Sequence, residues 1–328
     1  MANIQKINLI KPICYLHETE KYFPMKLNDY LDNCYVKKKN NDLVKFEYDI
    51  TGKYKEDVAL YPNKNEKFAN VKSLYRGNPN VDKVPYIVKV NDLGNGKSQI
   101  IFFFFFGYNG ETRILKDLIK LGKHYADLEH IYMIVDNNIL NNSNNKSEAI
   151  KSIDSVFYAA HSGGETFKLK DLEKEDDSIV VYIASRSHAS YRKKGLYLRY
   201  FGFGNDYTKK YYKWYPELYI IDKNFDPQLN DFINNYRGQL GFDHIWSFAT
   251  RDYFYGKLEK NKPEGVYLNE NIYKFLIYSL FIINLLLFGR EFYVFRKNKV
   301  INKKIIITLV ITFILLVIFY ALNTTYID

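Results

Sequence analysis

Cysteine is scarce in this chain, with only Cys14 and Cys34 among its 328 residues. Two thiols are too few to indicate the disulfide framework of small secreted domains. Residues Met1 to Ile10 contain no apolar run of signal-peptide length, so we expect no secretory leader there. The Gly-x-Ser-x-Gly motif of serine hydrolases is also absent, and no internal repeat is visible. These absences argue against a disulfide scaffold and against a serine hydrolase.

Positive charge is only mildly in excess over most of the chain. The formal net charge is +10, and residues 290–304 supply five of these charges, because six basic residues accompany one acid there. Asp328 subtracts one, so residues 1–289 carry +6. An excess of this size over such a length does not demand nucleic acid, and we expect no nucleic-acid partner.

Aromatic residues are plentiful, with 31 Tyr and 24 Phe in a chain that is 47% hydrophobic. Such residues favour strands and bury large areas. Short apolar segments separated by Gly, Pro and Asn clusters recur up to about residue 265. Residues 1–265 are therefore predicted to form a mainly β domain, a jelly-roll-like β-sandwich with a few short helices.

Individual segments carry their own predictions. The continuous apolar run Ile100–Phe106 is too short to span a membrane and predicts a strand buried on both faces. Leu27–Leu31 predicts one helical turn, and the spacing in Thr112–Leu121 predicts a short amphipathic helix. Asn137–Asn145 is rich in asparagine and predicts a surface loop.

The composition changes after residue 271. Residues 272–289 contain one charge, Lys274, and residues 305–322 contain none. Each stretch is long enough to cross a hydrocarbon core of about 30 Å as a helix. The sequence therefore predicts an integral membrane protein with a C-terminal two-helix transmembrane hairpin, a basic linker at 290–304 and a tail at 323–328. A long interfacial helix would also explain the first stretch.

Two rules conflict over the orientation of this hairpin. The basic linker belongs in the cytoplasm by the positive-inside rule, which would put residues 1–265 on the far side of the membrane. That domain would then have to cross a membrane without a signal peptide. We therefore favour a cytosolic N-terminal domain, although this places the linker in the lumen.

The segment His124–His130 concentrates ionisable side chains and leads into an alternating apolar run. The alternation favours a strand, with Asp127 and Glu129 on one face and His130 on the other. A turn entering the strand would bring His124 to the carboxylate face. His124, Asp127 and Glu129 would then form a ligand set for a divalent cation: Ca, Mg, Mn or Zn. A solvated loop that ends in a strand explains the same residues without a metal.

Two further histidines, His161 and His188, each follow an apolar segment that predicts a strand. Both lie beside small residues, which let a backbone or ligand approach closely. Strand ends of a β-sandwich gather at one rim, so these histidines and the central segment are candidates to converge. The alternative is that each histidine is a separate hydrogen-bonded structural residue.

Several strings resemble, in order over residues 12–245, the vacuolar protein sorting-associated protein 62 family, whose function is poorly known. The central segment matches its His-x-x-Asp-Trp-Glu-His string, with Leu128 in place of Trp. The other matching strings are Tyr15-Leu16-His17-Glu18, Glu20-Lys21-Tyr22-Phe23-Pro24, Tyr108-Asn109-Gly110, His161-Ser162-Gly163-Gly164, Ser187-His188-Ala189-Ser190-Tyr191, Gly204-Asn205-Asp206 with Thr208, Trp214-Tyr215-Pro216 and Arg237-Gly238-Gln239-Leu240-Gly241.

The same central string is similar to the heptapeptide of the necrosis- and ethylene-inducing-peptide-like cytolysins. That resemblance implies cation ligation by His124, Asp127 and Glu129 at the rim of a β-sandwich, and docking on sphingolipid head groups. Residues counted as supporting or ligand-binding are His130, His161, His188 and Asp206.

Three functions follow as hypotheses. The first is a membrane-anchored module that binds a divalent cation and a glycan or lipid head group, with membrane lipid as a partner and a role in membrane trafficking. The second is a structural or trafficking protein without a metal site. The third is a metal-assisted hydrolase, which would need an open metal position and a separate general base. We name no catalytic residue.

Overall fold

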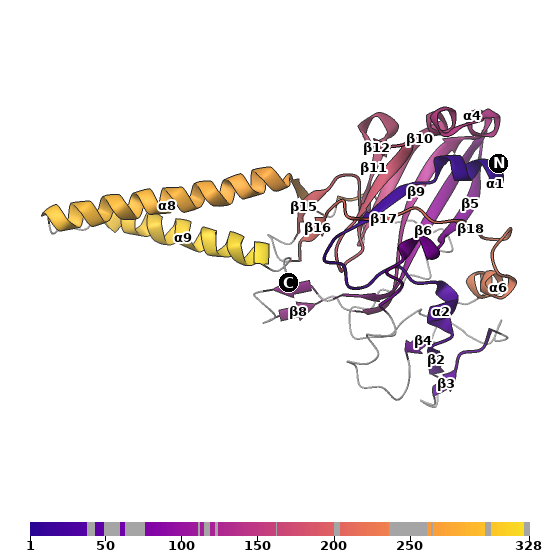
Figure 1. Ribbon diagram of the computed structural model, residues 1–328, viewed down its shortest axis with the longest axis horizontal. Helices are drawn as coiled ribbons and strands as arrows, with labels where there is room; N and C mark the ends of the chain where they lie inside the picture. Colours follow the sequence, from indigo (N-terminus) through magenta and orange to yellow (C-terminus); the bar gives the residue numbers. More distant parts are fainter. Residues whose placement is uncertain are drawn as a thin grey trace. The chain divides into compact units, whose positions relative to one another are not determined.

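The computed structural model (Figure 1) describes residues 1–37, 43–48, 60–62, 76–110, 112–114, 119–121, 124–161, 163–199, 204–235, 261–263, 265–298 and 303–324. The chain divides into two compact units. The first, here the β unit, comprises residues 1–112, 121–194 and 208–264. The second, here the helix-bearing unit, comprises residues 113–120, 195–207 and 265–328.

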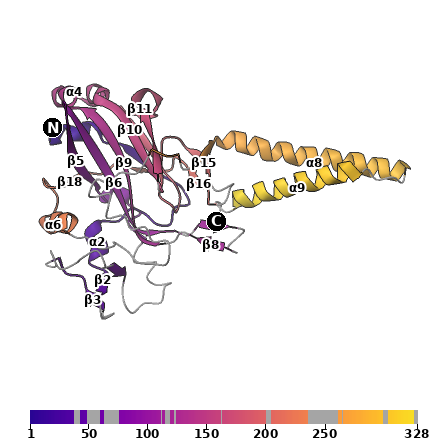
Figure 2. The same ribbon diagram turned by 180° about the vertical axis from the view of Figure 1, so that it is seen from behind.

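The β unit is organised around a six-stranded sheet, whose strands run side by side in Figures 1 and 2. Its order is β11 (Gly163–Lys168), β10 (Ile153–Ala160), β9 (His124–Asp136), β6 (Lys97–Asn109), β5 (Tyr86–Gly94) and β18 (Leu218–Ile220). All neighbours are antiparallel except β18 and β5, which are parallel.

The phenylalanine run lies at the centre of this sheet, in β6. Phe102, Phe104 and Phe106 enter one hydrophobic cluster, whereas Phe103 and Phe105 enter another on the opposite face. Side chains alternate along a strand, so a continuous apolar run fits a strand that has a core on each side. The predicted strand buried on both faces is confirmed.

A second sheet covers the face that carries the even-numbered phenylalanines. It joins β12 (Lys174–Glu175), β13 (Ser178–Ile183), β1 (Ile13–Leu16) and β17 (Tyr212–Trp214), and β14 (Ser190–Tyr191) pairs with β13. Cys14, Val181 and Trp214 from this sheet share a hydrophobic cluster with Phe102 and Phe104. β1 and β13 run parallel. The mainly β prediction is therefore confirmed, but the parallel pairs depart from the antiparallel pairing of a jelly roll, and that finer topology is not confirmed.

Short elements cover the other face and the ends of the β unit. The helices are α1 (Ile4–Ile7), α2 (Leu27–Leu31), α4 (Asn137–Asn142), α5 (Lys146–Ala149) and α6 (Pro227–Asn235), with single 3-10 turns at Asn8–Ile10, Val81–Lys83, Ile150–Ser152 and Leu169–Asp171. A small sheet orders β3 (Leu43–Lys45), β2 (Cys34–Lys37) and β4 (Leu60–Pro62). The predicted turn of helix at Leu27–Leu31 is confirmed.

Two local predictions are wrong. Asn137–Asn142 forms a helix rather than a loop, because the Asp136 side chain caps its start by accepting from the N–H groups of Asn138 and Ile139. The stretch predicted as the helix Thr112–Leu121 contains two paired strands, β7 (Thr112–Ile114) and β8 (Ile119–Leu121), with residues 115–118 outside the described ranges. Pairing between strands overrides the local helical spacing there.

The helix-bearing unit holds a three-stranded sheet and the long C-terminal helices. The sheet orders β16 (Asp206–Thr208), β15 (Gly195–Leu198) and β19 (Val266–Leu268). α8 (Glu270–Asn298) and α9 (Lys303–Thr324) lie side by side in Figures 1 and 2, and the Thr312 hydroxyl donates to Asn284 Oδ1 across 2.8 Å. Within the described part of the chain, Lys274–Lys297 is the candidate membrane span, with a mean hydropathy of 1.6. The second span stays a prediction.

Gly77 provides a test of close backbone packing in the β unit. Its φ is +73°, and an added Cβ would lie 1.9 Å from the Phe23 carbonyl oxygen. We expect Gly77→Ala to lower the free energy of unfolding by about 2 kcal/mol more than Gly96→Ala. Gly96 is the matched control, because its φ is +74° and nothing lies within 4 Å of the added atom. Urea titrations of both variants measure the difference, and equal losses would show that the Phe23 backbone gives way freely.

Candidate functional site

His188 forms the centre of a buried charged cluster at the ends of several β-unit strands. Its Nδ1 lies 2.7 Å from Asp127 Oδ2, and its Nε2 lies 3.1 Å from the Tyr22 carbonyl oxygen. Both ring nitrogens therefore face acceptors, and only the imidazolium form can donate to both. The ring is fully buried and stacks on Phe106 with centroids 3.7 Å apart. This geometry favours a positively charged histidine held against an aromatic face.

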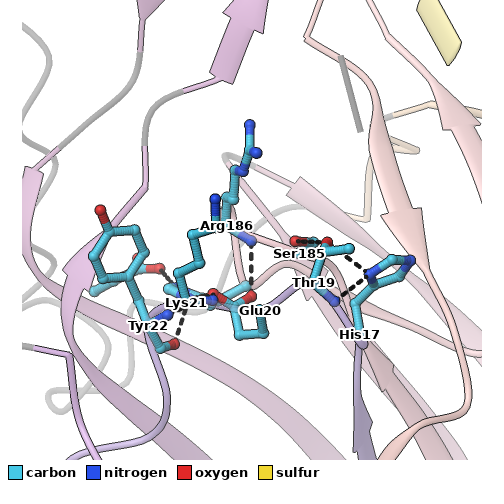
Figure 3. Close-up of polar contacts among 9 residues, drawn as sticks. His17, Thr19, Glu20, Lys21, Tyr22, Ser185 and Arg186 are labelled. Atoms are coloured by element: carbon cyan, nitrogen blue, oxygen red, sulfur yellow. Dashed lines mark hydrogen bonds and ion pairs between the residues drawn. The ribbon is translucent and has the colours of Figure 1, made fainter. Parts of the chain in front are cut away.

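Glu20 supplies the second carboxylate of the cluster (Figure 3). Its Oε1 accepts the backbone N–H groups of Lys21 and Tyr22, each at 2.8 Å. Its Oε2 accepts the backbone N–H of Arg186 at 2.8 Å, while the Arg186 side chain extends away in Figure 3. Glu20 Oε1 also lies 3.7 Å from His188 Nε2. One buried carboxylate thus ties the segment after β1 to the turn after β13.

The charges of this cluster stabilise one another. Burial lowers the pKa of His188, but the charge of Glu20 and the hydrogen bonds to Asp127 and Glu20 outweigh it and raise that pKa to about 9. Burial raises the pKa of Glu20, but the positive charge of His188 and the backbone N–H groups prevail and lower it. One imidazolium and two carboxylates leave the cluster with a formal charge of −1.

Backbone strain gathers around the same residues. Ala126, Arg186 and His188 have φ values of 56°, 69° and 56°, in the left-handed region that residues with a Cβ seldom adopt. Two backbone hydrogen bonds close the turn from Ala184 to Ala189: the Ala184 N–H donates to the Ala189 carbonyl oxygen, and the His188 N–H donates to the Ala184 carbonyl oxygen. Strain of this kind persists where surrounding contacts over-determine it, and it often marks functional sites.

Of the three predicted ligands, His124 and Asp127 lie close together. Asp127 and Glu129 pair with Phe106 and Phe104 in the β6–β9 register, so they lie on the same face, as the alternation predicts. His124 Nε2 lies 3.9 Å from Asp127 Oδ1, on the far side of the left-handed Ala126. Glu129 is buried, 8% exposed. His124 thus approaches Asp127 from within β9, past an irregularity of the strand at Ala126, rather than from a turn that enters the strand.

The other candidate residues have different surroundings. His130 pairs with Phe103 on the opposite face, lies between the rings of Phe103 and Phe157, and is fully buried. Burial lowers the pKa of His130 to about 3, so this ring is neutral. His161 follows β10 in a left-handed conformation with φ 59°. Asp206 belongs to the helix-bearing unit, where its Oδ2 lies 3.9 Å from Arg199 Nη1.

The described residues do not assemble a metal-binding group. Across the ranges given above, no three His, Cys, Asp or Glu side chains are placed so that they could hold one ion. Asp127 already binds the His188 imidazolium through Oδ2, which occupies a carboxylate oxygen that the predicted cation would use. The divalent cation stays a prediction. Glu20 is the residue to which the sequence patterns assign no role, although it lies inside one of the matching strings.

The sequence of the chain is similar to one known protein family. Residues 1–210 match the family described as "Vacuolar protein sorting-associated protein 62". The chain belongs to this family. The match contains Glu20, Asp127 and His188, so the charged cluster lies wholly within the part that defines membership in the vacuolar protein sorting-associated protein 62 family.

Individual relatives are more distant. The chain is 23% identical over 280 residues to "Putative vacuolar protein sorting-associated protein TDA6" of Saccharomyces cerevisiae, and the match covers 71% of this chain and 57% of that relative. The chain thus spans a little over half the length of this relative.

Among solved structures, "Toxin fold for microbial attack and plant defense" is similar with 11% identity and a TM-score of 0.39, covering 72% of this chain and 82% of that one. "NLPPya in complex with mannosamine" is similar with 11% identity and a TM-score of 0.35, covering 70% and 77%. These scores are too low to carry an argument about the site.

Proposed function

We propose that this chain is a membrane-anchored member of the vacuolar protein sorting-associated protein 62 family, with α8 holding the β unit at a membrane. The observation that carries the proposal is the exposed apolar surface of α8. Only 6% of the window Lys274–Lys297 is buried, and Leu285 and Leu286 at its middle are 56% and 68% exposed. A soluble protein rarely exposes so much continuous apolar surface. A lipid bilayer would cover it.

Microsomes carrying the full chain test the anchor. The protein is expected to stay in the membrane pellet after alkaline carbonate extraction. Lysines at Leu285 and Leu286, combined with lysines at Ile311 and Ile314 of α9, should release it, since each charge at the centre of a span costs about 3 kcal/mol. The matched control places four lysines on exposed β-unit residues: Val44, Leu93, Ile139 and Tyr211. Recovery of the unaltered chain in the supernatant would contradict the anchor.

The same microsomes report the orientation. We propose that the β unit faces the cytosol, because that arrangement needs no translocation of a large folded unit. Protease added outside sealed microsomes should then digest the β unit, and the acceptor sequons at Asn141 and Asn145 should stay unmodified. Protection of the β unit together with glycan on either asparagine would reverse the orientation.

We infer a role in vacuolar sorting from family membership, with the charged strand ends as the recognition surface of the β unit. The cluster has a formal charge of −1, and the side chains of its member Asp127 and of the neighbouring His124 are 10% and 13% exposed. A partly exposed anionic site suits a head group that brings positive charge, or hydroxyl groups that donate hydrogen bonds to carboxylates. Glycan or lipid head groups remain the proposed ligands.

Cation binding is the second candidate, favoured by the shared face of Asp127 and Glu129 and the approach of His124 to Asp127 Oδ1. Such a cation would compete with His188 for Asp127. If it binds, purified full chain should retain one divalent ion per molecule by elemental analysis, and Glu129→Gln should lose it. Glu165→Gln, also a partly buried glutamate of the same sheet, serves as the matched control. Ion content of the unaltered chain no higher than that of Glu129→Gln would exclude the candidate.

A further inference from the structure

Basic residues gather at one end of the paired helices α8 and α9. Six of the residues in 290–304 are basic. α8 ends at Asn298 and α9 begins at Lys303, so only four residues separate them. A connection this short spans at most about 18 Å even when extended. The basic residues at the end of α8 and at the start of α9 therefore lie at the same end of the helix pair.

The basic side chains at this end are exposed, whereas the acidic one is buried. Arg296, Lys297, Lys303 and Lys304 are exposed, whereas the one acid of the region, Glu291, is only 7% exposed. Phe292 and Tyr293, which flank the basic residues, are 59% and 65% exposed. The surface of this end therefore combines positive charge with aromatic rings. Aromatic residues of this kind concentrate at the level of lipid head groups.

We propose that this end of α8 and α9, here the basic tip, binds anionic phospholipid head groups. The proposal rests on the membrane anchor proposed above, is independent of the orientation proposed for it, and adds the class of lipid. In α8 the charge-free stretch 275–289 ends at Arg290, and the helix continues for nine residues, which is about 13 Å at 1.5 Å per residue. The head-group layer on each side of a bilayer is about 5–7 Å thick. The end of α8 therefore crosses the level of the lipid phosphates.

Lipid selectivity is the property that separates binding from simple solvation. Lysine and arginine are attracted to an anionic membrane surface, and salt weakens this attraction. Basic residues that are only hydrated would be indifferent to the lipid beside them. A basic tip that binds head groups with a net negative charge would enrich anionic lipid around the protein.

The test uses the full chain reconstituted in phosphatidylcholine vesicles with a small fraction of spin-labelled lipid. Electron spin resonance measures how much labelled phosphatidylserine and labelled phosphatidylcholine the protein immobilises. We expect a preference of about threefold for phosphatidylserine at low salt, falling toward one at high salt. Both leaflets have the same composition, so orientation does not affect the result. The tip variant is Arg296→Gln, Lys297→Gln, Lys303→Gln and Lys304→Gln.

A matched control changes the net charge equally on the β unit. It replaces four exposed lysines with glutamine: Lys151, Lys168, Lys170 and Lys223. The proposal requires the preference to disappear in the tip variant and to persist in this control. A preference near one in the unaltered chain, or one that survives in the tip variant, overturns it. Loss of immobilised lipid of both kinds, with the chain extracted by carbonate, would instead refute the membrane anchor.

Discussion

Replacing His188 with glutamine is expected to lower the free energy of unfolding of the β unit by about 4 kcal/mol. The substitution removes the positive charge from between Glu20 and Asp127 and leaves two carboxylates facing each other in a buried site. Breaking a buried ion pair from one side typically costs about 3–5 kcal/mol. A domain has only about 5–15 kcal/mol in total, so the variant should be close to its stability limit.

His161→Gln is the matched control for this measurement. His161 and His188 have nearly equal φ values, 59° and 56°, so placing glutamine in the left-handed region costs the same at both positions. The excess loss at His188 then reports the charged cluster together with the stacking of the buried ring on Phe106. Urea unfolding followed by the fluorescence of buried Trp214 measures both variants. Losses that agree within about 0.5 kcal/mol would mean that the cluster contributes no net stability.

The same cluster predicts how stability depends on pH. The folded-state pKa of His188, about 9, lies above its ordinary value of 6.5. Its contribution is therefore fully present below pH 6.5 and is lost as the pH rises through 9. A shift of this size corresponds to about 3 kcal/mol. Glu20 acts in the opposite direction, because its pKa is lowered: its contribution is present above its ordinary value of 4.5 and is lost in acid.

Unfolding titrations between pH 5 and pH 10 check this dependence. The unaltered chain should be most stable between about pH 4.5 and 6.5 and should lose about 3 kcal/mol by pH 10 relative to the His188→Gln variant. The variant is the control, because titrating groups outside the charged cluster affect both proteins equally. Parallel profiles for the two proteins at alkaline pH would show that His188 is neutral in the folded state.

Local patterns in the sequence predict those structural features that are determined by residues close together in the chain. The phenylalanine run predicts a strand with two buried faces, and alternation predicts the shared face of Asp127 and Glu129; the structure has both. The helix at Asn137–Asn142 was within reach of the same reasoning. Asp136 is a strong N-cap residue directly before the asparagine-rich stretch.

Long-range pairing explains what the sequence patterns miss. Glu20 meets the Arg186 backbone 166 positions away, and Asp127 meets His188 61 positions away. No local period encodes these partners, because the parallel alignment of β1 with β13 creates the first meeting. Strand ends meet at one rim of the sheets, and this rule predicts that His188 lies near the central segment. The partner of His188 proves to be a carboxylate pair rather than a shared metal in the described residues.

The phenylalanine run of β6 leaves a problem of alignment for the folding chain. Five identical side chains in succession present the same surface to each face after a slip of one residue, whereas slips normally exchange buried and exposed groups. The correct alignment of β6 on β9 must therefore be chosen by residues outside the run. Phe106 opposite Asp127 is the position where a slip would carry the carboxylate away from His188. The charged cluster thus fixes the register of a phenylalanine run that cannot fix its own register.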